Sequence, residues 1–357
     1  MFEEPSGFAF VKARNPVPKG SATPRFTVIK RTGQSAARTS PLLVLLISAG
    51  CGGMQSTLDP AGIEAGLVRT LFLVMAIAGG LIWFGVMATL FAAMLRVRRS
   101  SEQTAGRFIL WGGAVFPAVM LFALLTYALW LMPTLRPVAA AGDAADLRIE
   151  VTGRQYWWQV VYHHRGVQIA AANEVRLPVG RRVEFSLKSD DVIHSFWIPS
   201  LGGKMDMIPG RENRLSLIAE KTGVFRGACA EFCGTSHAFM ALTAVAMEPD
   251  AFDAWLVAEA EASIDVEGDG SELFLRHGCG ACHRVAGTDA VGAVGPDLSH
   301  LGSRRMLAAG IIANTEDNIA GFIANPAAIK PGAAMPAFAM LPPQDIRAIA
   351  AWLKGLR

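Results

Sequence analysis

Two long stretches without a charged residue constrain this chain more than any other feature. They run from Thr70 to Leu95 and from Phe108 to Leu135. The hydrocarbon core of a bilayer is about 30 Å thick, and about 20 helical residues cross it. Hydrophobic residues make up 52% of the chain and charged residues only 18%, which is too apolar for an ordinary soluble protein. We therefore predict a hairpin of two membrane-spanning helices rather than two buried core helices.

The segment between the two stretches predicts the orientation of the hairpin. It carries Arg96, Arg98, Arg99 and Arg107, and short loops rich in arginine stay on the cytoplasmic side. Everything after Leu135 is then expected on the outer, periplasmic side of a bacterial cell membrane. The net charge of +3 gives no compositional support for nucleic acid binding.

The first fifty residues are similar to a secretory leader. Basic residues, among them Lys30 and Arg31, precede a short apolar core, LLVLLISAG, which leads to Cys51. This order predicts a signal segment that is removed from the mature protein. The sequence SAGC is similar to a lipoprotein processing box, in which Cys51 becomes the lipidated N-terminus. A plain signal anchor with a passive Cys51 is the alternative.

The loop CAEFCGTSHAFM, at residues 229–240, concentrates residue types that bind metals. An upstream run, DDVIHSFWIPS, adds a second histidine in a strand-like setting. In chain order the candidate ligands are His194, Cys229, the backbone carbonyl of Glu231, Cys233, His237 and Met240.

These candidates form a soft ligand set that suits copper. A single-copper electron-transfer site takes one cysteine, two histidines and a weak methionine. The second cysteine therefore predicts two copper ions bridged by the two sulfur atoms, with one histidine for each ion. A structural zinc site of two cysteines and two histidines and a disulfide between the cysteines are the alternatives. Either of them would leave Met240 unexplained.

A second redox centre is indicated near the C-terminus. Cys279, Cys282 and His283 form the C-x-x-C-H signature of covalent heme attachment. Downstream, IKPGAAMPAF offers Met335 as a second axial ligand, and a His/Met pair raises the potential of the iron. Met340 is the competitor, but the prolines on both sides of Met335 favour that residue. The five cysteines are then accounted for by lipidation, copper and heme.

Short β-branched and aromatic runs between the two centres predict strands, bounded by Gly, Pro or Asp. These runs are DLRIEVTGRQYWWQVVYH, ANEVRLPV, RRVEFSLKSD and NRLSLIAEKTGVFRG. They have the pattern of an antiparallel sandwich. We expect five segments: a leader (1–50), a transmembrane helical hairpin (51–140), a copper domain (141–248), a helix and linker (249–269) and a cytochrome domain (270–357).

The copper loop and the stretch DVIHSFWIPSLGGKMDMIPGRENR resemble the paired signatures of cytochrome c oxidase subunit II. This resemblance covers roughly Gly66 to Met247 and implies a cupredoxin-like β-barrel that holds the dinuclear copper A centre. It implies a magnesium ion shared with subunit I through the Glu231 side chain, and it places Asp206 near that interface. With its C-terminal heme motif, the chain resembles the caa-type subclass, in which a small all-α cytochrome c domain is fused to subunit II.

For such a subunit, the resemblance implies a path for electrons. They would pass from the chain's own heme to copper A and on to subunit I, where oxygen is reduced and protons are translocated. The expected partners are subunit I, the other oxidase subunits, membrane lipid, and an upstream cytochrome bc complex or cytochrome c donor. The aromatic stretch that receives electrons in the family corresponds to Tyr156 and Trp157, although core packing is the alternative for both.

Three departures from the family are visible. The aromatic order is Tyr-Trp-Trp rather than Trp-Tyr-Trp. Leu110 stands where many members have a proton-path glutamate, and Glu102 lies further upstream, so we assign no proton-path role. Acidic residues that would dock a soluble cytochrome c are few, and His163, His164 and Arg165 occupy that region. A fused heme domain in place of the soluble donor would explain the third departure.

Two rival functions share part of this pattern. Nitrous oxide reductase has the same copper fold but needs a large histidine-rich domain, and this chain has only seven histidines. The same scarcity argues against an oxygen-reducing site in this chain. A membrane-anchored carrier for another reductase, such as a nitric oxide reductase, remains the alternative.

Overall fold

The structure is a computed structural model that describes residues 52–95, 101–135, 147–164, 166–261 and 268–357. The predicted leader with Cys51, the arginines at 96, 98 and 99, Arg165 and part of the acidic linker lie outside the described residues. Predictions about them are not addressed by the structure.

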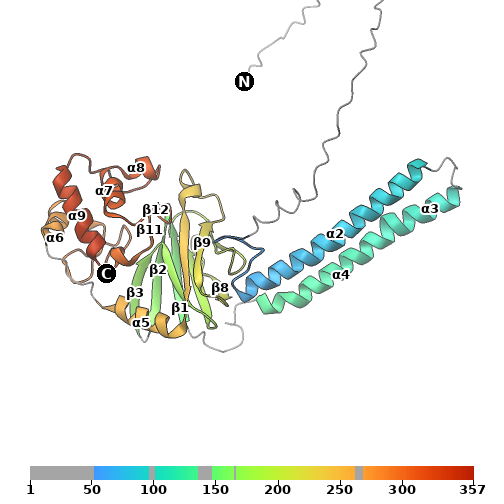
Figure 1. Cartoon of the computed structure of the whole chain (residues 1–357), viewed down its shortest axis with the longest axis horizontal. Helices are drawn as coiled ribbons and strands as arrows, with labels where there is room; N and C mark the ends of the chain where they lie inside the picture. Colours follow the sequence, from blue (N-terminus) through green and yellow to red (C-terminus); the bar gives the residue numbers. More distant parts are fainter. Residues whose placement is uncertain (1–51, 96–100, 136–146, 165, 262–267) are drawn as a thin grey trace, which may run out of the picture. The chain divides into compact units, whose positions relative to one another are not determined.

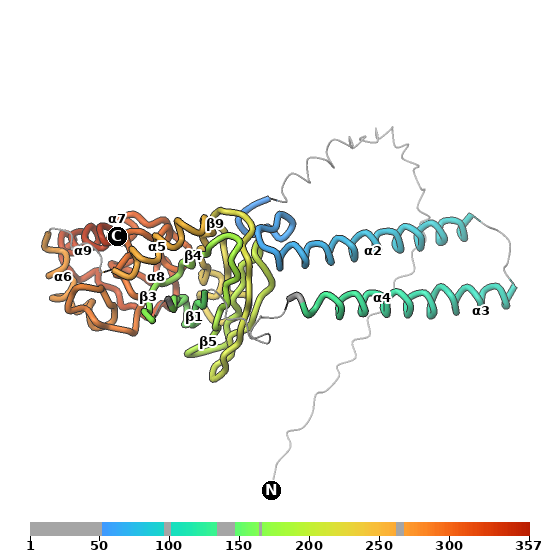
Figure 2. Tube along the Cα trace, turned by 90° about the horizontal axis from the view of Figure 1, so that it is seen from below, coloured from blue at the N-terminus to red at the C-terminus, as the bar shows by residue number. Residues whose placement is uncertain are grey.

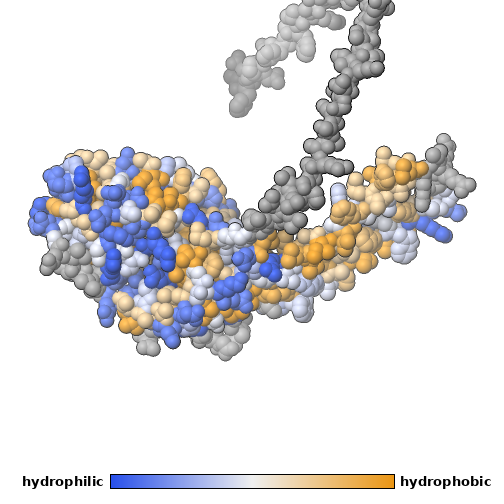
Figure 3. All heavy atoms as spheres, in the orientation of Figure 1, coloured by the Kyte–Doolittle hydropathy of each residue, from blue (hydrophilic) through white to orange (hydrophobic). Residues whose placement is uncertain are grey.

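Two long apolar helical segments form the hairpin. Helix α2 (Ile63–Leu95) runs beside a second segment built from α3 (Glu102–Leu110), the π-helical turn η2 (Trp111–Val115), α4 (Phe116–Leu131) and the short η3 (Met132–Leu135) (Figures 1 and 2). Both segments are long and apolar enough to cross a membrane, and their most apolar windows are 0% buried. On the face shown in Figure 3, apolar residues are concentrated along the middle of the long helices. The prediction of two apolar helices is confirmed.

The π-helical turn has a local cause in the sequence. Pro117 cannot donate a backbone hydrogen bond to the preceding turn, and Gly112 and Gly113 leave the backbone free to widen there. The amide of Phe116 bonds to the carbonyl of Trp111, five residues back. The second helix thus continues across the proline, as spanning helices tolerate.

The middle of the chain forms ten strands. They are β1 (Leu147–Arg154), β2 (Trp157–His164), β3 (Val167–Ala172), β4 (Glu174–Pro178), β5 (Arg182–Ser189), β6 (His194–Trp197), β7 (Met205–Met207), β8 (Asn213–Ile218), β9 (Gly223–Cys229) and β10 (Ala241–Met247). One sheet has the order β3-β2-β1-β5-β8 and the other β4-β10-β9-β6-β7. This sandwich is the predicted cupredoxin-like domain.

The sheets differ from the sequence prediction in two details. The aromatic run DLRIEVTGRQYWWQVVYH holds two antiparallel strands, because β1 and β2 are joined at Gln155 and Tyr156. The run NRLSLIAEKTGVFRG likewise holds β8 and β9. Two of the strand pairs, β1 with β5 and β4 with β10, are parallel, so the sandwich is mixed rather than purely antiparallel.

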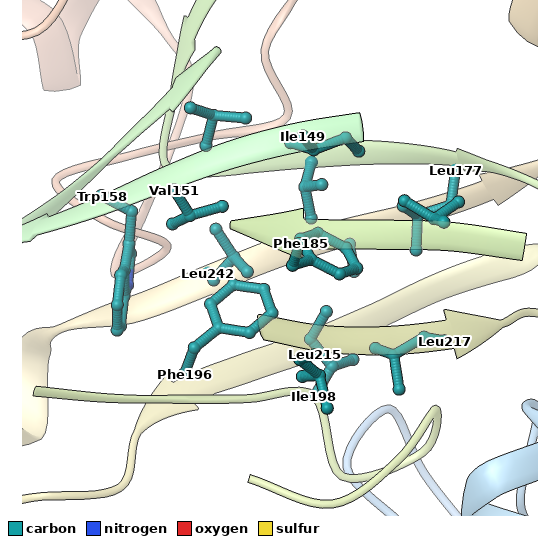
Figure 4. Packing of buried hydrophobic residues seen from close by; sticks show 14 of the residues in the cluster. Ile149, Val151, Trp158, Leu177, Phe185, Phe196, Ile198, Leu215, Leu217 and Leu242 are labelled. Carbon is teal, nitrogen blue, oxygen red and sulfur yellow. The ribbon is translucent and has the colours of Figure 1, made fainter. Parts of the chain in front are cut away.

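The core of the sandwich lies between the two sheets (Figure 4). Ile149 and Val151 alternate along β1 and point toward Phe185 and Phe196, whose ring centroids lie 5.1 Å apart. Each large apolar side chain buried in this way contributes about 1.5–3 kcal/mol. The rigid core fixes the ends of the strands, from which the functional loops extend.

The first helix is tied to the sandwich by a buried carboxylate. Glu64, only 4% exposed, accepts hydrogen bonds from Arg182 and from the backbone amide of Ile218, both at 3.0 Å. A buried charge needs such partners to offset its loss of hydration. The hairpin and the sandwich are therefore joined by specific bonds at the start of α2.

The C-terminal part is mostly helical. Helix α5 (Pro249–Ala260) packs on the sandwich core through Phe252 and Leu256. A separate core follows, built by α6 (Gly270–Arg276), η6 (Cys279–Ala281), η7 (Leu301–Ser303), the two-residue strands β11 (Met306–Leu307) and β12 (Ile312–Ala313), α7 (Glu316–Ala324), α8 (Pro326–Ile329) and α9 (Pro343–Gly355) (Figure 1). This agrees with the small helical cytochrome domain expected from the sequence.

Candidate functional site

The candidate metal ligands meet at one edge of one sheet, where β9 ends and β6 and β10 begin. Strand β9 ends at Cys229, β10 begins at Ala241, and the loop between them contains the short turn η5 (His237–Phe239). Strand β6 begins at His194 and pairs with β9, so that Phe196 lies opposite Cys229. The register of this pairing brings His194 to a loop that is 35 residues away in sequence.

The sulfur and nitrogen atoms lie close together. The donor atoms of His194, Cys229 and Cys233 are all within 4.8 Å of one another. Sγ of Cys229 lies 3.8 Å from Nδ1 of His194 and 3.2 Å from the carbonyl oxygen of Glu231. The structure thus gathers one imidazole and one backbone oxygen around the first thiol.

The second thiol has a matching set of neighbours. Sγ of Cys233 lies 3.6 Å from Nδ1 of His237 and 3.8 Å from Sδ of Met240. All six candidates from the sequence are therefore brought together, and each sulfur has one imidazole and one weak donor. Both cysteines are buried free thiols. They form no disulfide with each other in this structure.

The two thiols share their protons unequally. A hydrogen bond with Cys233 lowers the pKa of Cys229 to about 3, and contacts with His194 and the backbone add to this effect. The same hydrogen bond, together with burial, raises the pKa of Cys233 far above its ordinary value. Cys233 would therefore lose its proton only with a cation beside it. Metal binding provides such a cation and releases the proton. The donor set therefore fits a soft metal centre.

Residues that the sequence reasoning missed hold His194 in place. Asp191 Oδ1 lies 2.7 Å from Nε2 of His194, which leaves Nδ1 directed at Cys229. A Cβ atom on Gly153 would lie 2.8 Å from Cδ2 of the imidazole, so only glycine fits beside the ring. Trp158 packs edge-on against the same ring, and the centroids of the two rings lie 6.1 Å apart. Asp191 was visible in the sequence, three residues before the histidine, as a possible second partner.

The turn between β1 and β2 supports the loop from another side. Gln155 Nε2 donates to the carbonyl of Cys233 at 2.6 Å, and the Tyr156 hydroxyl accepts from the amide of Thr235 at 3.0 Å. Gly234 has φ +125°, and a Cβ there would lie 2.6 Å from that hydroxyl. Of the two predicted electron-accepting aromatics, Tyr156 is thus buried against the loop, while Trp157 remains partly exposed.

The heme-attachment motif has a histidine held for coordination. Nδ1 of His283 lies 2.8 Å from the carbonyl oxygen of Pro296, which leaves Nε2 free to bind iron. Burial lowers the pKa of His283 and keeps the imidazole neutral, which is the form that binds metal. A Cβ on Gly295 would lie 2.5 Å from Cε1 of this ring. The motif therefore fits a covalently attached heme.

The remaining predicted heme residues are consistent with this site. Cys279 and Cys282 are free thiols; Cys279 is partly exposed and Cys282 is exposed. Met335 packs against the core of the cytochrome domain, whereas Met340 is 76% exposed. This difference supports Met335 over its competitor.

The carboxylates named from the family resemblance lie at the surface. The side chains of Glu231 and Asp206 are exposed or partly exposed, and Lys204 lies 3.3 Å from Asp206. Glu102 begins α3 next to its N-cap, Ser101. The Ser101 side chain caps the helix by accepting from the amide of Thr104, and we assign Glu102 no proton-path role.

Comparison with known proteins agrees with this arrangement. The family "Cytochrome C oxidase subunit II, periplasmic domain" matches residues 162–247, and the family "Cytochrome c" matches residues 268–357. Cytochrome c oxidase subunit 2 of Alkalihalophilus pseudofirmus is 34% identical over 343 residues, with 91% of this chain and 98% of the relative covered. The subunit 2 of Bacillus subtilis is 32% identical over 350 residues, with 88% and 96% covered.

Among solved structures, the periplasmic domain of subunit II of the Bradyrhizobium japonicum cytochrome oxidase is similar. It is 34% identical, with a TM-score of 0.31, 33% of this chain covered and 95% of that one. Two apolar helices, a β-sandwich with a cluster of thiols and imidazoles, and a C-terminal heme motif define a membrane-anchored subunit of a heme-copper oxidase. The chain belongs to the cytochrome c oxidase subunit II family, and its second domain places it in the fused, caa-type subclass.

Proposed function

We propose that this chain is the electron-transfer subunit of a terminal respiratory oxidase. It would receive electrons at its own c-type heme and deliver them through a dinuclear copper A centre to subunit I, where oxygen is reduced to water. The single observation that carries the proposal is the pairing at the metal centre. Each of the two buried thiols has one imidazole and one weak donor beside it.

The copper ions would be held by the six residues of the metal centre. The thiolates of Cys229 and Cys233 and the imidazoles of His194 and His237 would be the main ligands, and Met240 and the Glu231 carbonyl would be weak ones. Such a centre supplies one-electron redox chemistry. The two buried thiols are fixed by the surrounding strands, which would limit the movement of the ligands between redox states.

The heme would be attached through Cys279 and Cys282, and His283 and Met335 would hold its iron. The chain's own contribution is to fix the tautomer of His283 through the Pro296 carbonyl. It also keeps the imidazole neutral through burial. The Tyr156 side chain, which contacts the metal loop, is the proposed electron-accepting aromatic, and the partly exposed Trp157 is the second candidate.

The proposed setting is the bacterial cell membrane, with the copper and heme domains on the periplasmic side. The exposed apolar helices would contact lipid and oxidase subunit I. An upstream cytochrome bc complex or cytochrome c is the proposed donor. The exposed side chain of Glu231 is available for a magnesium ion shared with subunit I. The complex is expected to translocate protons, but we assign no residue of this chain to that role.

Metal and optical analysis of the full chain in detergent tests the proposal. We expect two copper ions that share one unpaired electron, seen by electron paramagnetic resonance, and one covalently bound heme. Cys229→Ser should abolish the shared copper signal and leave the heme spectrum intact. Cys282→Ser should weaken covalent heme attachment and leave the copper signal unchanged.

Two results would contradict the proposal. Zinc in place of copper, with an intact heme, would exclude electron transfer through the metal centre. If the chain, purified from its native membrane with copper and heme bound, came without an oxidase subunit I, this result would instead favour a carrier for another reductase.

A further inference from the structure

Three loops of the cytochrome domain contact the metal-binding end of the sandwich, and residues 303–305 add contacts to Glu174 and Arg176 of β4. The three loops are the one before Pro296, whose carbonyl contacts His283, the one before Met335, and the turn between β11 and β12.

The first contact is made by Arg154, the last residue of β1. Its Nη1 donates to the carbonyls of Ala293 and Val294, at 3.2 and 3.4 Å. These carbonyls directly precede Gly295, which packs on the proposed axial histidine. Nη2 of Arg154 pairs with Asp190 at 2.7 Å, and its guanidinium lies 5.5 Å from the centre of the Trp157 ring. A surface pair and an aromatic ring therefore fix the direction of this donor.

The second contact joins the metal loop to the methionine loop. The hydroxyl of Ser236, which lies between Cys233 and His237, donates to the carbonyl of Pro331. A Cβ on Gly332 would lie 3.4 Å from the Tyr156 ring. The loop that carries Met335 thus lies against both the metal loop and the tyrosine that supports it.

The third contact holds a left-handed turn of the cytochrome domain. Ala308, Ala309 and Gly310 all have positive φ, at 52°, 60° and 76°, which is costly for the two alanines. The Gly310 carbonyl accepts from Nη1 of Arg226 at 2.6 Å, and the Ala309 carbonyl accepts from the amide of Ala241 at 3.0 Å. Ala241 directly follows the proposed ligand Met240. The unusual backbone is compensated by bonds to the strands that flank the metal loop.

We propose that Arg154 is a positioning residue, which holds the chain's own cytochrome domain in one orientation on the metal-binding end of the sandwich. This proposal rests on the proposed function. Arg154 contacts neither metal centre. It holds the loop on the histidine side of the heme site, while Ser236 holds the loop on the methionine side. Both faces of the heme site are thus fixed relative to the metal loop.

The step that this docking serves is the transfer of one electron. With both groups bound, the heme would lose one electron and the copper ions would gain it, with no bond made or broken. A tethered domain that also docks in one orientation spends more time in the productive geometry than a tether alone allows. The role of Arg154 is to raise the population of that geometry.

Arg154→Ala in the full, cofactor-loaded chain tests the proposal. Two amides at separate points of the interface serve as reporters: Ala241, bonded to Ala309, and Arg305, bonded to Glu174. Loss of a charge-assisted bond should make both amides exchange about tenfold faster, since exchange follows the undocked population. Electron transfer from the photoreduced heme to copper should slow, with the copper resonance and the heme absorption unchanged.

Arg148→Ala is the matched control, because Arg148 lies on the same strand and pairs with exposed Glu212. It should change neither amide. Arg154→Lys should recover part of the protection, because an ammonium can still donate to one carbonyl. If Arg154→Ala fails to fold, Arg226→Gln removes the bond to Gly310 and the Arg305 amide reports on it.

Unchanged exchange at both amides would overturn the proposal, as would loss of the copper signal in Arg154→Ala, which would give Arg154 a role in the metal site. The exchange measurement reports on docking whichever metal is bound. Its failure is therefore distinguishable from a failure of the proposed function, which depends on the metal and heme analysis.

Discussion

Asp191 Oδ1 lies 2.7 Å from Nε2 of His194, on the side of the ring opposite the Cys229 sulfur, which is 3.8 Å from Nδ1. Burial disfavours the charged form of this imidazole, but hydrogen bonds to Cys229 and Asp191 outweigh it and raise the pKa of His194. The carboxylate thus fixes the orientation of the ring and increases its basicity. This is the arrangement by which a second residue tunes a metal ligand.

Asp191→Asn should weaken the metal centre without unfolding the domain. Removing such a partner typically lowers metal affinity by about 10- to 100-fold. We expect copper to be lost at lower chelator concentrations, measured as the shared copper resonance against added chelator. Asp253→Asn, at an exposed surface pair with Arg181, is the control. An unchanged chelator midpoint in Asp191→Asn would show that the carboxylate has no influence on the ligand.

Gly153→Ala should displace His194, because the new methyl group would lie 2.8 Å from the imidazole. Overpacking of this kind costs about 1–3 kcal/mol. We expect a lower denaturant midpoint and an altered copper resonance. Gly203→Ala, in the same domain with open space around it, should have neither effect. A wild-type resonance in Gly153→Ala would mean that the ring adjusts without consequence.

Gly295→Ala should disturb the heme site in the same way. Its methyl group would lie 2.5 Å from Cε1 of His283, and the cost is again about 1–3 kcal/mol. We expect a shifted midpoint potential of the heme, measured by optical redox titration, with the copper resonance unchanged. Gly321→Ala, which has no neighbour within 4 Å, is the control. An identical potential in Gly295→Ala would contradict the packing argument.

Lys330 should make the stability of the cytochrome domain depend on pH. Its Nζ donates to the Ala308 carbonyl at 3.0 Å, and burial lowers its pKa to about 7. Between that value and the ordinary 10.5, the unfolded chain binds more protons, so the free energy of unfolding should rise with pH. The slope is at most about 1.4 kcal/mol per pH unit.

Lys330→Met removes this titration and provides the measurement. Urea midpoints of the heme absorption at several pH values from 6 to about 10 should rise in the wild type and stay flatter in the variant. Lys354→Met, at another lysine of the same domain that donates to a backbone carbonyl, should retain the wild-type slope. Equal slopes in the wild type and Lys330→Met would show that Lys330 does not titrate in this range.

Much of the architecture follows from local patterns. Apolar length predicts the two spans, because a bilayer imposes that length on any helix that crosses it. The spacing of Cys279, Cys282 and His283 predicts heme attachment, because both sulfurs and the imidazole must reach one porphyrin. The strand runs were less clear, since the turn at Gln155 and Tyr156 has no glycine or proline to mark it.

The sequence by itself determined which chemistry this protein can hold, because ligand softness and the spacing of Cys229, Cys233 and His237 are properties of one short loop. Only the tertiary structure decided what surrounds that loop. His194 meets Cys229 across 35 residues through the register of two strands, and Arg154 reaches Ala293 across 139. Such distances depend on how sheets and domains pack, and packing sums many weak contacts that no local pattern records.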